Sequence, residues 1–424
     1  MSAGLVVVGG LIFLSILGIP IFLSLGIATV IAMTMSGMPF VVIPQKMFAG
    51  INSISLLAIP FFMLAGNIMA RGITMKLIDV SNAFIGWIKG SLAVVTVLAS
   101  ALFGAISGSA TATVSAVGGT TIPAMKKEGY PDYFAGAIAS MAAILGPMIP
   151  PSITLIVYGS ITETSISKLF IASVIPGLIL CCGLLAYTLF YGKKMDLPSK
   201  PKKSGKEILL TIKSSIWALC MPILILGGIF GGIFTATEAS AVAVAYAFFV
   251  SLFIYKDLTI KEVPRILVEA AISTAAILML VGLSKSSSYV IVTSRLPQAV
   301  LGAFQEFTSS PIVMLMLINI MFLLIGMLME ANAAIVMMTP LLMPLMNAFH
   351  IDPIHFGLIM SVNLYIGLVT PPVGICILLG NQMAGAKLER TLRAAMPMIL
   401  IALIVLLLVT YVPGLTTWLP SILT

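Results

Sequence analysis

Glycines and prolines recur at matched positions in the two halves of this chain, and this repetition constrains the fold more than any other feature. Seven such residues have an identical residue 221 positions later: Pro123, Gly136, Gly146, Pro150, Pro151, Gly159 and Pro176 are matched by Pro344, Gly357, Gly367, Pro371, Pro372, Gly380 and Pro397. Glycine frees the backbone and proline restricts it, so identical residues at these points indicate similar backbone geometry. The sequence therefore predicts an internal duplication.

Long apolar runs place both halves in a membrane. Of the 424 residues, 60% are hydrophobic and only 8% are charged, whereas soluble proteins carry about 25% charged residues. Runs such as residues 91–106 and 396–412 approach the roughly 20 apolar residues that span a bilayer. The composition predicts an all-α polytopic membrane protein.

Motifs for several chemical classes are missing from the sequence. It contains no GxxxxGK[ST] loop for ATP hydrolysis and no Ser–His or His–Glu–x–x–His set for proteolysis. The cysteines lie in apolar runs without the spacing of metal ligands, which favours core packing. They are Cys181, Cys182, Cys220 and Cys376. We therefore expect neither an enzyme nor a bound cofactor.

Each half consists of the same series of segments on either side of a polar linker. The first repeat covers residues 1–191, the linker 192–207 and the second repeat 208–424. In each repeat, three spans precede a long interrupted segment, a proline-broken span and a final span. The predicted segments are 4–17, 20–37, 52–70, 88–125, 132–158 and 168–191, then 208–232, 235–255, 265–288, 311–346, 353–380 and 390–412.

The interrupted segments 88–125 and 311–346 could each be two full spans or one re-entrant hairpin. Lysine and arginine collect in short cytoplasmic loops, so charge distinguishes these alternatives. With hairpins, each repeat crosses the membrane five times, which makes the repeats inverted and puts both termini outside. The linker and Arg71 then fall inside, whereas two extra spans would move Arg71 to the side of the uncharged C-terminus. We therefore predict inverted repeats with hairpins, and interpret the net charge of +8 as a topology signal, which excludes nucleic acid as a partner.

Two proline pairs interrupt apolar segments at equivalent places. The stretches are GPMIPPS, residues 146–152, and GLVTPPVG, residues 367–374. Irregular backbone at membrane depth is tolerated only where protein or a watery cavity satisfies its polar groups. Broken helices in duplicated, inverted halves are typical of secondary transporters, with the site near the bilayer midplane. Freed carbonyls at helix C-ends can coordinate a cation, and amides at helix N-ends attract an anion.

The candidate site is the place where each hairpin tip faces the break of its own half. Hydroxyls, amides and free carbonyls suit a hard cation such as Na⁺. The candidate sodium ligands are Ser107, Ser109, Gly146, Met148, Ile149, Gly326, Gly367 and Thr370. The candidate substrate contacts are Ser107, Thr111, Ser152, Asn332 and Pro371. Glu330 is either functional, as an ionisable group within a membrane, or a cap for the second limb of its hairpin. Small residues at the tips are also explained by close helix packing alone.

The motifs together resemble the large membrane subunit of the tripartite ATP-independent periplasmic (TRAP) transporters, which belong to the ion transporter superfamily. The resemblance rests on both proline breaks, on the tip SGSATAT (residues 107–113) and on GIFTATEASAVAVAYA (residues 232–247). It implies a scaffold, an elevator-type transport domain and Na⁺-coupled uptake of organic acids across the bacterial inner membrane. It also implies two sodium sites, one at Ser107–Ser109 with Gly146 and one at Gly326 with Gly367–Thr370. Many members carry Asp where this chain has Glu330.

The resemblance further implies two protein partners. One is a small four-span membrane subunit, and the other is a periplasmic binding protein that delivers the substrate. Sialic acid is the favoured substrate, followed by a C4-dicarboxylate, and both termini are then periplasmic. Since no arginine lies near either tip in the sequence, bound Na⁺ and helix N-ends would supply the positive field for a carboxylate. The alternatives are a proton-coupled transporter with Glu330 as the carrier, and a channel built from the two re-entrant segments.

Overall fold

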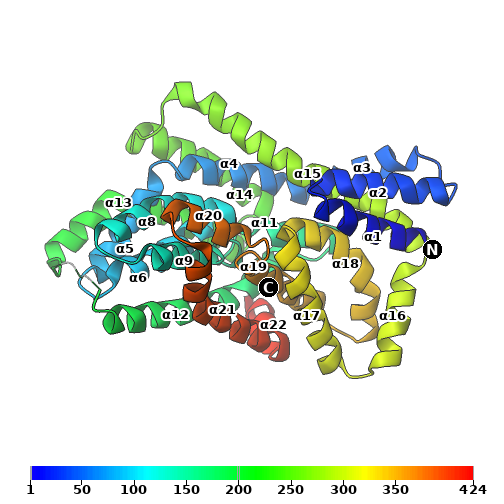
Figure 1. The fold of residues 1–424 in the computed structure, drawn as a ribbon. Helices are drawn as coiled ribbons and strands as arrows, with labels where there is room; N and C mark the ends of the chain where they lie inside the picture. Colours follow the sequence, from blue (N-terminus) through cyan, green and yellow to red (C-terminus); the bar gives the residue numbers. More distant parts are fainter. Residues whose placement is uncertain (1, 198, 200, 424) are drawn as a thin grey trace.

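The computed structural model describes residues 2–197, 199 and 201–423, and every regular element within them is helical (Figure 1). Eight of these helices are long and apolar enough to cross a membrane, or nine if a pair bent by 65° counts as one span. Lipid offers no hydrogen bonds, so each segment satisfies its backbone groups internally as a helix. The prediction of an all-α polytopic membrane protein is confirmed.

One group of helices forms the upper part of the molecule in Figure 1. Its centre is α15, which packs along α2, α3 and α4, while α14 also packs on α4. The members are α1 (Ala3–Ile16), α2 (Ile21–Met35), α3 (Val42–Ile51), the 3₁₀ turn η1 (Ile54–Leu57), α4 (Ala58–Met69), α13 (Gly205–Phe230), α14 (Ala236–Phe249) with its π-helical extension η3 (Val250–Ile254), η4 (Ile260–Glu262) and α15 (Val263–Thr293).

Two pairs of limbs occupy the predicted hairpin segments. The first limb of hairpin 1 is α6 (Ser91–Ser107), and its second limb comprises α7 (Ala110–Thr113), the π-turn η2 (Val114–Gly118) and α8 (Gly119–Lys127). Hairpin 2 consists of α17 (Pro311–Leu328) and α18 (Ala331–Ala348). The turns at residues 108–109 and 329–330 are called tip 1 and tip 2 below. That each hairpin enters and leaves by one membrane face stays a prediction.

Both double prolines interrupt a helix. The first broken helix comprises α9 (Asp132–Ala143), α10 (Leu145–Met148) and α11 (Ile153–Thr162), and the second α19 (Pro353–Gly367) and α20 (Ile375–Ala384). The Pro150–Pro151 and Pro371–Pro372 bonds are cis. In the most apolar part of the first broken helix 94% is buried, against 28% in α13. The first break is therefore surrounded by protein, whereas Pro371, Pro372 and Val373 of the second break are exposed.

The two halves interlock at the broken helices. The α9 helix packs along α20, and α11 packs along α18, so each broken helix contacts elements from the other half. The Ser140 hydroxyl donates to the Gly136 carbonyl one turn earlier in α9 and, at 3.0 Å, to the Cys376 carbonyl of α20. This packing fixes the positions of the two broken helices relative to each other.

The remaining helices link or flank these elements. Of these, α12 and α21 match the predicted final spans, whereas α5, α16 and α22, like α3 above, lie outside the predicted spans. They are α5 (Ile73–Ile85), α12 (Ile166–Lys194), α16 (Leu296–Phe307), α21 (Leu388–Tyr411) and α22 (Gly414–Leu423). The predicted linker 192–207 includes residues 198 and 200, which lie outside the described residues. The repeat boundaries and the inverted relation of the halves stay predictions.

Candidate functional site

Tip 1 is built from a left-handed glycine and a serine cap. The α6 helix ends at Ser107 because Gly108 adopts a φ of +61°, a conformation that favours glycine. The Ser109 hydroxyl accepts from the Ala112 N–H at 3.3 Å and caps α7. It also lies 3.1 Å from the Thr111 hydroxyl. Tip 1 therefore carries several hydroxyls and no charge.

The backbone of tip 1 lies directly against the first break. A Cβ added to Gly146 would lie 2.5 Å from the Thr113 hydroxyl and 2.8 Å from the Ser109 carbonyl oxygen. A Cβ added to Gly108 would lie 2.6 Å from the Pro151 carbonyl oxygen. Only glycine permits these approaches, and they bring carbonyl and hydroxyl oxygens from both segments together.

The first limb of hairpin 2, just before tip 2, makes a close backbone contact with the second broken helix. A Cβ added to Gly367 would lie 2.3 Å from the Gly326 carbonyl carbon. The Val373 N–H donates to the Met327 carbonyl at 3.2 Å, which ties the break to the first limb of hairpin 2. The Thr370 hydroxyl is turned back to its own helix and donates to the Ile366 carbonyl at 2.7 Å.

Tip 2 differs from tip 1 in its cap, which is a carboxylate. Glu330 accepts from the Asn332 N–H at 3.0 Å and the Ala333 N–H at 3.3 Å, and so caps α18. The Asn332 amide group donates to the same carboxylate at 2.7 Å. These three donors stabilise a carboxylate at a helix N-terminus. The capping role considered for Glu330 is therefore present.

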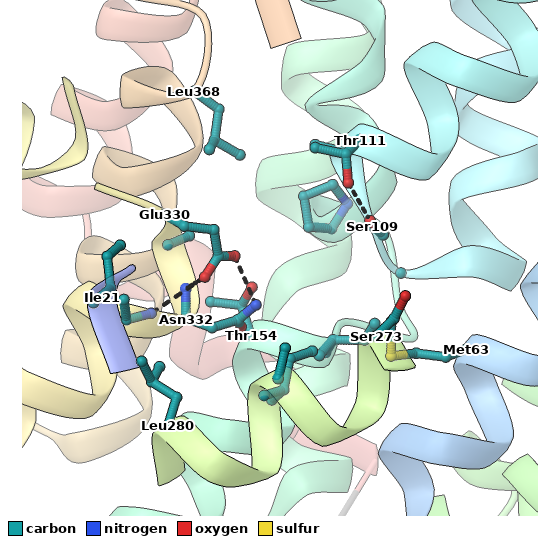
Figure 2. Close-up of a pocket in the computed structure, with 18 of the residues that line it drawn as sticks. Ile21, Met63, Ser109, Thr111, Thr154, Ser273, Leu280, Glu330, Asn332 and Leu368 are labelled. Carbon is teal, nitrogen blue, oxygen red and sulfur yellow. Dashed lines mark hydrogen bonds between the residues drawn. The ribbon is translucent and has the colours of Figure 1, made fainter. Parts of the chain in front are cut away.

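Both tips open onto one cavity of about 370 Å³ (Figure 2), which is near the lower end of the usual range for small-ligand sites. Its polar lining includes Ser109, Thr111, Glu330 and Asn332 from the tips. Part of the apolar lining comes from α2, α4 and α15, through residues such as Phe22, Met63 and Leu280. No lysine or arginine is among the described residues that line it. The cavity therefore lies between the tips and the upper helix group.

A smaller space adjoins the cavity at each tip. One of about 270 Å³ is lined by Ser107, Ser109 and Thr111 together with Asn67 of α4. The other, of about 180 Å³, is lined by Gly326 and Glu330 together with residues of the second break such as Gly374. Each tip therefore borders both the shared cavity and a space of its own.

The predicted site residues divide into three groups by position. Ser109, Thr111, Glu330 and Asn332 line the shared cavity, and Ser107 and Gly326 line the adjoining spaces. Gly146 and Gly367 form the backbone contacts between tips and breaks. The others line none of these three spaces in the part of the chain that is described; they are Met148, Ile149, Ser152, Thr370 and Pro371.

The residues outside these spaces have other surroundings. The Met148 carbonyl faces α12, where a Cβ on Gly177 would lie 3.4 Å away. The Ser152 hydroxyl caps α11 and lies 2.9 Å from the Tyr365 hydroxyl. Pro371 is exposed. The breaks therefore contribute to the site mainly through the glycines that admit the tips.

Several residues that line the cavity are not among the predicted site residues. Tyr365 lies in the last turn of α19, before the second break, and lines the cavity. Thr154, at the start of α11 just after the first break, lines it too. Thr154 is only two residues from the predicted contact Ser152, and this proximity is a signal that could have identified it as a site residue. Ser273 lies in the middle of the apolar α15, where only the three-dimensional arrangement brings it to the tips (Figure 2).

An all-helical membrane protein with a cavity between two broken helices has the organisation of a secondary transporter. The family model for the tripartite ATP-independent periplasmic transporter, DctM component, matches residues 8–415. The chain therefore belongs to this family and is the large permease of a TRAP transporter. The resemblance inferred from the motifs is confirmed.

Two curated relatives and one solved structure agree with this assignment. The chain is 41% identical over 377 residues to the C4-dicarboxylate TRAP transporter large permease protein DctM of Pseudomonas aeruginosa, covering 89% of this chain and 88% of the relative. It is 36% identical over 409 residues to the sialic acid TRAP transporter large permease protein SiaM of Vibrio cholerae, covering 96% and 95%. The Alcanivorax borkumensis YdaH transporter shares the fold, with a TM-score of 0.62, 13% identity and 88% of each chain covered.

Proposed function

We propose that this permease couples the uptake of an organic acid to an inward Na⁺ gradient. The supporting observation is the convergence of both hairpin tips and both broken helices on one cavity. Carbonyl and hydroxyl oxygens crowd at the Gly146 contact, and the Gly326 carbonyl oxygen lies at the Gly367 contact. Transporters hold coupling cations at the ends of such half-helices. Sodium at these two places is the coupling ion, and no other cofactor takes part.

A sodium ion beside the cavity would also stabilise the bound acid. Because no lysine or arginine lines the described part of the cavity, a carboxylate there lacks an ion-pair partner from the protein. Bound Na⁺ supplies this positive charge, so the acid binds well only when sodium is present. Coupling then follows from binding itself.

Proton coupling through Glu330 is the less favoured alternative. A proton carrier must alternate between a charged and a neutral form. Three N–H donors point at this carboxylate, and such bonds stabilise the charged form. We therefore propose that Glu330 is charged when the acid binds and is not the proton carrier.

The remaining features of the proposal follow from family membership. The hairpins and broken helices form the transport domain of an elevator, and the upper helix group belongs to the scaffold. The chain lies in a bacterial inner membrane with periplasmic termini. It works with a small four-span membrane subunit and a periplasmic binding protein, in contact with lipid and not with nucleic acid. Sialic acid is the first substrate to test and a C4-dicarboxylate the second, because the two relatives carry these names.

The proposal is tested by removing the hydroxyls at tip 1. The double variant Ser107→Ala with Ser109→Ala, reconstituted with its partners in proteoliposomes, should lose at least about tenfold of its Na⁺-driven uptake, since each lost ligand group weakens ion binding. Ser100→Ala is the matched control, because this buried serine of α6 has no hydrogen-bond partner for its hydroxyl and lines none of the spaces at the tips.

Other results would contradict the proposal. Unchanged Na⁺ dependence in the double variant would exclude tip 1 as a sodium site. Uptake driven by a pH gradient without sodium would favour proton coupling. Flux that follows the acid gradient alone, without any ion, would favour a channel.

A further inference from the structure

The cavity has a chemically distinct end at tip 2, formed by Glu330 and Asn332. Figure 2 shows these two side chains on one side of the cavity, with Ser109 and Thr111 on the other. The tip 2 end carries a carboxylate, whereas the tip 1 end carries hydroxyls only. The cavity is therefore polarised between its two tips.

The charge at tip 2 is already matched by the protein. The first amides of α18 donate to Glu330, so the N-terminus of this 18-residue helix stabilises a carboxylate of its own chain. A carboxylate from a ligand would meet like charge here without a cationic side chain to offset it. A Na⁺ in the adjoining space would be neutralised by Glu330, which lines that space too. Like charges placed together in a poorly solvated site oppose binding strongly.

Asn332 leaves one acceptor unused at the same end. Only its amide nitrogen can donate to the Glu330 carboxylate, so the Oδ1 atom must point elsewhere. This oxygen is buried without a partner, and the side chain, only 8% exposed, lines the cavity. A buried acceptor without a donor is unfavourable. A ligand hydroxyl would supply that donor.

We propose that the cavity binds an organic acid in one orientation, with its carboxylate at Ser109 and Thr111 and its hydroxyl groups at Glu330 and Asn332. It therefore selects hydroxylated monocarboxylates over dicarboxylates of similar length. Glu330 accepts one hydroxyl proton through a lone pair that the α18 amides leave free, and Asn332 Oδ1 accepts another. This inference rests on the proposed function, because it assumes that the cavity holds the transported acid.

Binding to the purified full-length chain in NaCl tests the selectivity by calorimetry. D-Gluconate and adipate both have six carbons, but gluconate carries hydroxyls where adipate carries its second carboxylate. Sialic acid and succinate extend the comparison. We expect gluconate or sialic acid to bind at least about tenfold more tightly than either dicarboxylate, because sites built for hydroxyls reject analogues that lack them. Equal or tighter binding of the dicarboxylates, or no binding of any acid, would overturn the inference.

Two matched variants separate the charge of Glu330 from its capping role. Asp and Asn are both good N-caps and have the same length, so Glu330→Asp and Glu330→Asn differ mainly in charge. The ratio of hydroxylated acid to dicarboxylate binding should be at least about fivefold higher in Glu330→Asp, because only this variant keeps the repulsion. A role confined to capping predicts the same ratio in both variants, and that result would overturn the inference.

Asn332→Ala provides a second, independent variant should the Glu330 variants fold poorly. It should weaken gluconate binding and leave adipate binding nearly unchanged. Equal weakening of both acids would count against the orientation. Acids that bind in the expected order but are not accumulated under a Na⁺ gradient would refute the proposed coupling alone. Na⁺-driven accumulation without selectivity would refute only this inference.

Discussion

The two hairpin tips share a backbone contact but differ in their caps. A glycine of each broken helix admits the main chain of its hairpin: Gly146 lies against Ser109 at tip 1, and Gly367 lies against Gly326 in the first limb of hairpin 2. Tip 1 is capped by the neutral Ser109, and tip 2 by the carboxylate of Glu330. The matched glycines give both hairpins a close backbone contact, and the different caps give the shared cavity two unlike ends.

This difference separates two tasks. The glycine contacts bring oxygens together and close each tip on its break, which a coupling cation requires at both places. The caps face the cavity, where an asymmetric solute benefits from asymmetric ends. Under the proposed function, duplication therefore supplies the cation sites, and divergence of the caps supplies the recognition of the acid.

The largest effect is expected from filling the glycine contacts. Gly146→Ala places a methyl group 2.5 Å from the Thr113 hydroxyl, and Gly367→Ala places one 2.3 Å from the Gly326 backbone. Tips that cannot close should lose about 100-fold or more of Na⁺-driven uptake, as small displacements in a site can cost. Gly119→Ala, in the second limb of hairpin 1, is the control, because nothing lies within 4 Å of its added Cβ. Wild-type uptake in either Gly146→Ala or Gly367→Ala would show that the glycine contacts are not needed for transport.

A smaller effect is expected from giving tip 1 the charge of tip 2. Ser109→Asp and Ser109→Asn both keep a side chain that can cap α7, but only Asp adds a carboxylate. We expect the acid to bind at least about tenfold more weakly in Ser109→Asp than in Ser109→Asn, because the acid then meets like charge at both ends. Calorimetry at fixed NaCl measures the difference. Equal affinities would show that the charge of the cap does not matter at this end.

The smallest effect concerns the link between the halves at the cavity wall. Tyr365→Phe removes a hydroxyl that lies 2.9 Å from Ser152 Oγ, which should lower the free energy of unfolding by about 1 kcal/mol. Tyr158→Phe removes a similarly buried phenol that donates to the Pro353 carbonyl at 2.7 Å but does not line the cavity. Thermal unfolding should shift in both variants, and acid affinity only in Tyr365→Phe. A change in affinity in both would argue against a local role.

Much of the helical framework could be predicted from the sequence. Apolar runs marked the long helices, and the double prolines marked the interruptions at residues 149–152 and 368–374, because both signals are local. The short helices α5 and α16 were not predicted, since they are too short to resemble spans. The capping role of Glu330 was considered because its position before α18 is also a local signal.

The cavity wall could not be predicted in the same way. Ser273 and Met63 come from helices whose sequences show only apolar periodicity, and their contact with the tips depends on long-range packing. Met148 and Ile149 are predicted sodium ligands because a break in a helix frees backbone carbonyls. Sequence spacing does not tell which way those carbonyls turn, and the Met148 carbonyl faces α12. Tip residues were easier to identify because each hairpin must turn at them.

The most direct test of one shared cavity is protection of both tips by the same solute. Single cysteines at Thr111 and Asn332, in a chain whose four native cysteines are replaced, would be labelled with a water-soluble maleimide. The prediction is that sialic acid slows labelling at both positions in NaCl and at neither position in KCl. Protection at only one tip, or equal protection in KCl, would contradict it.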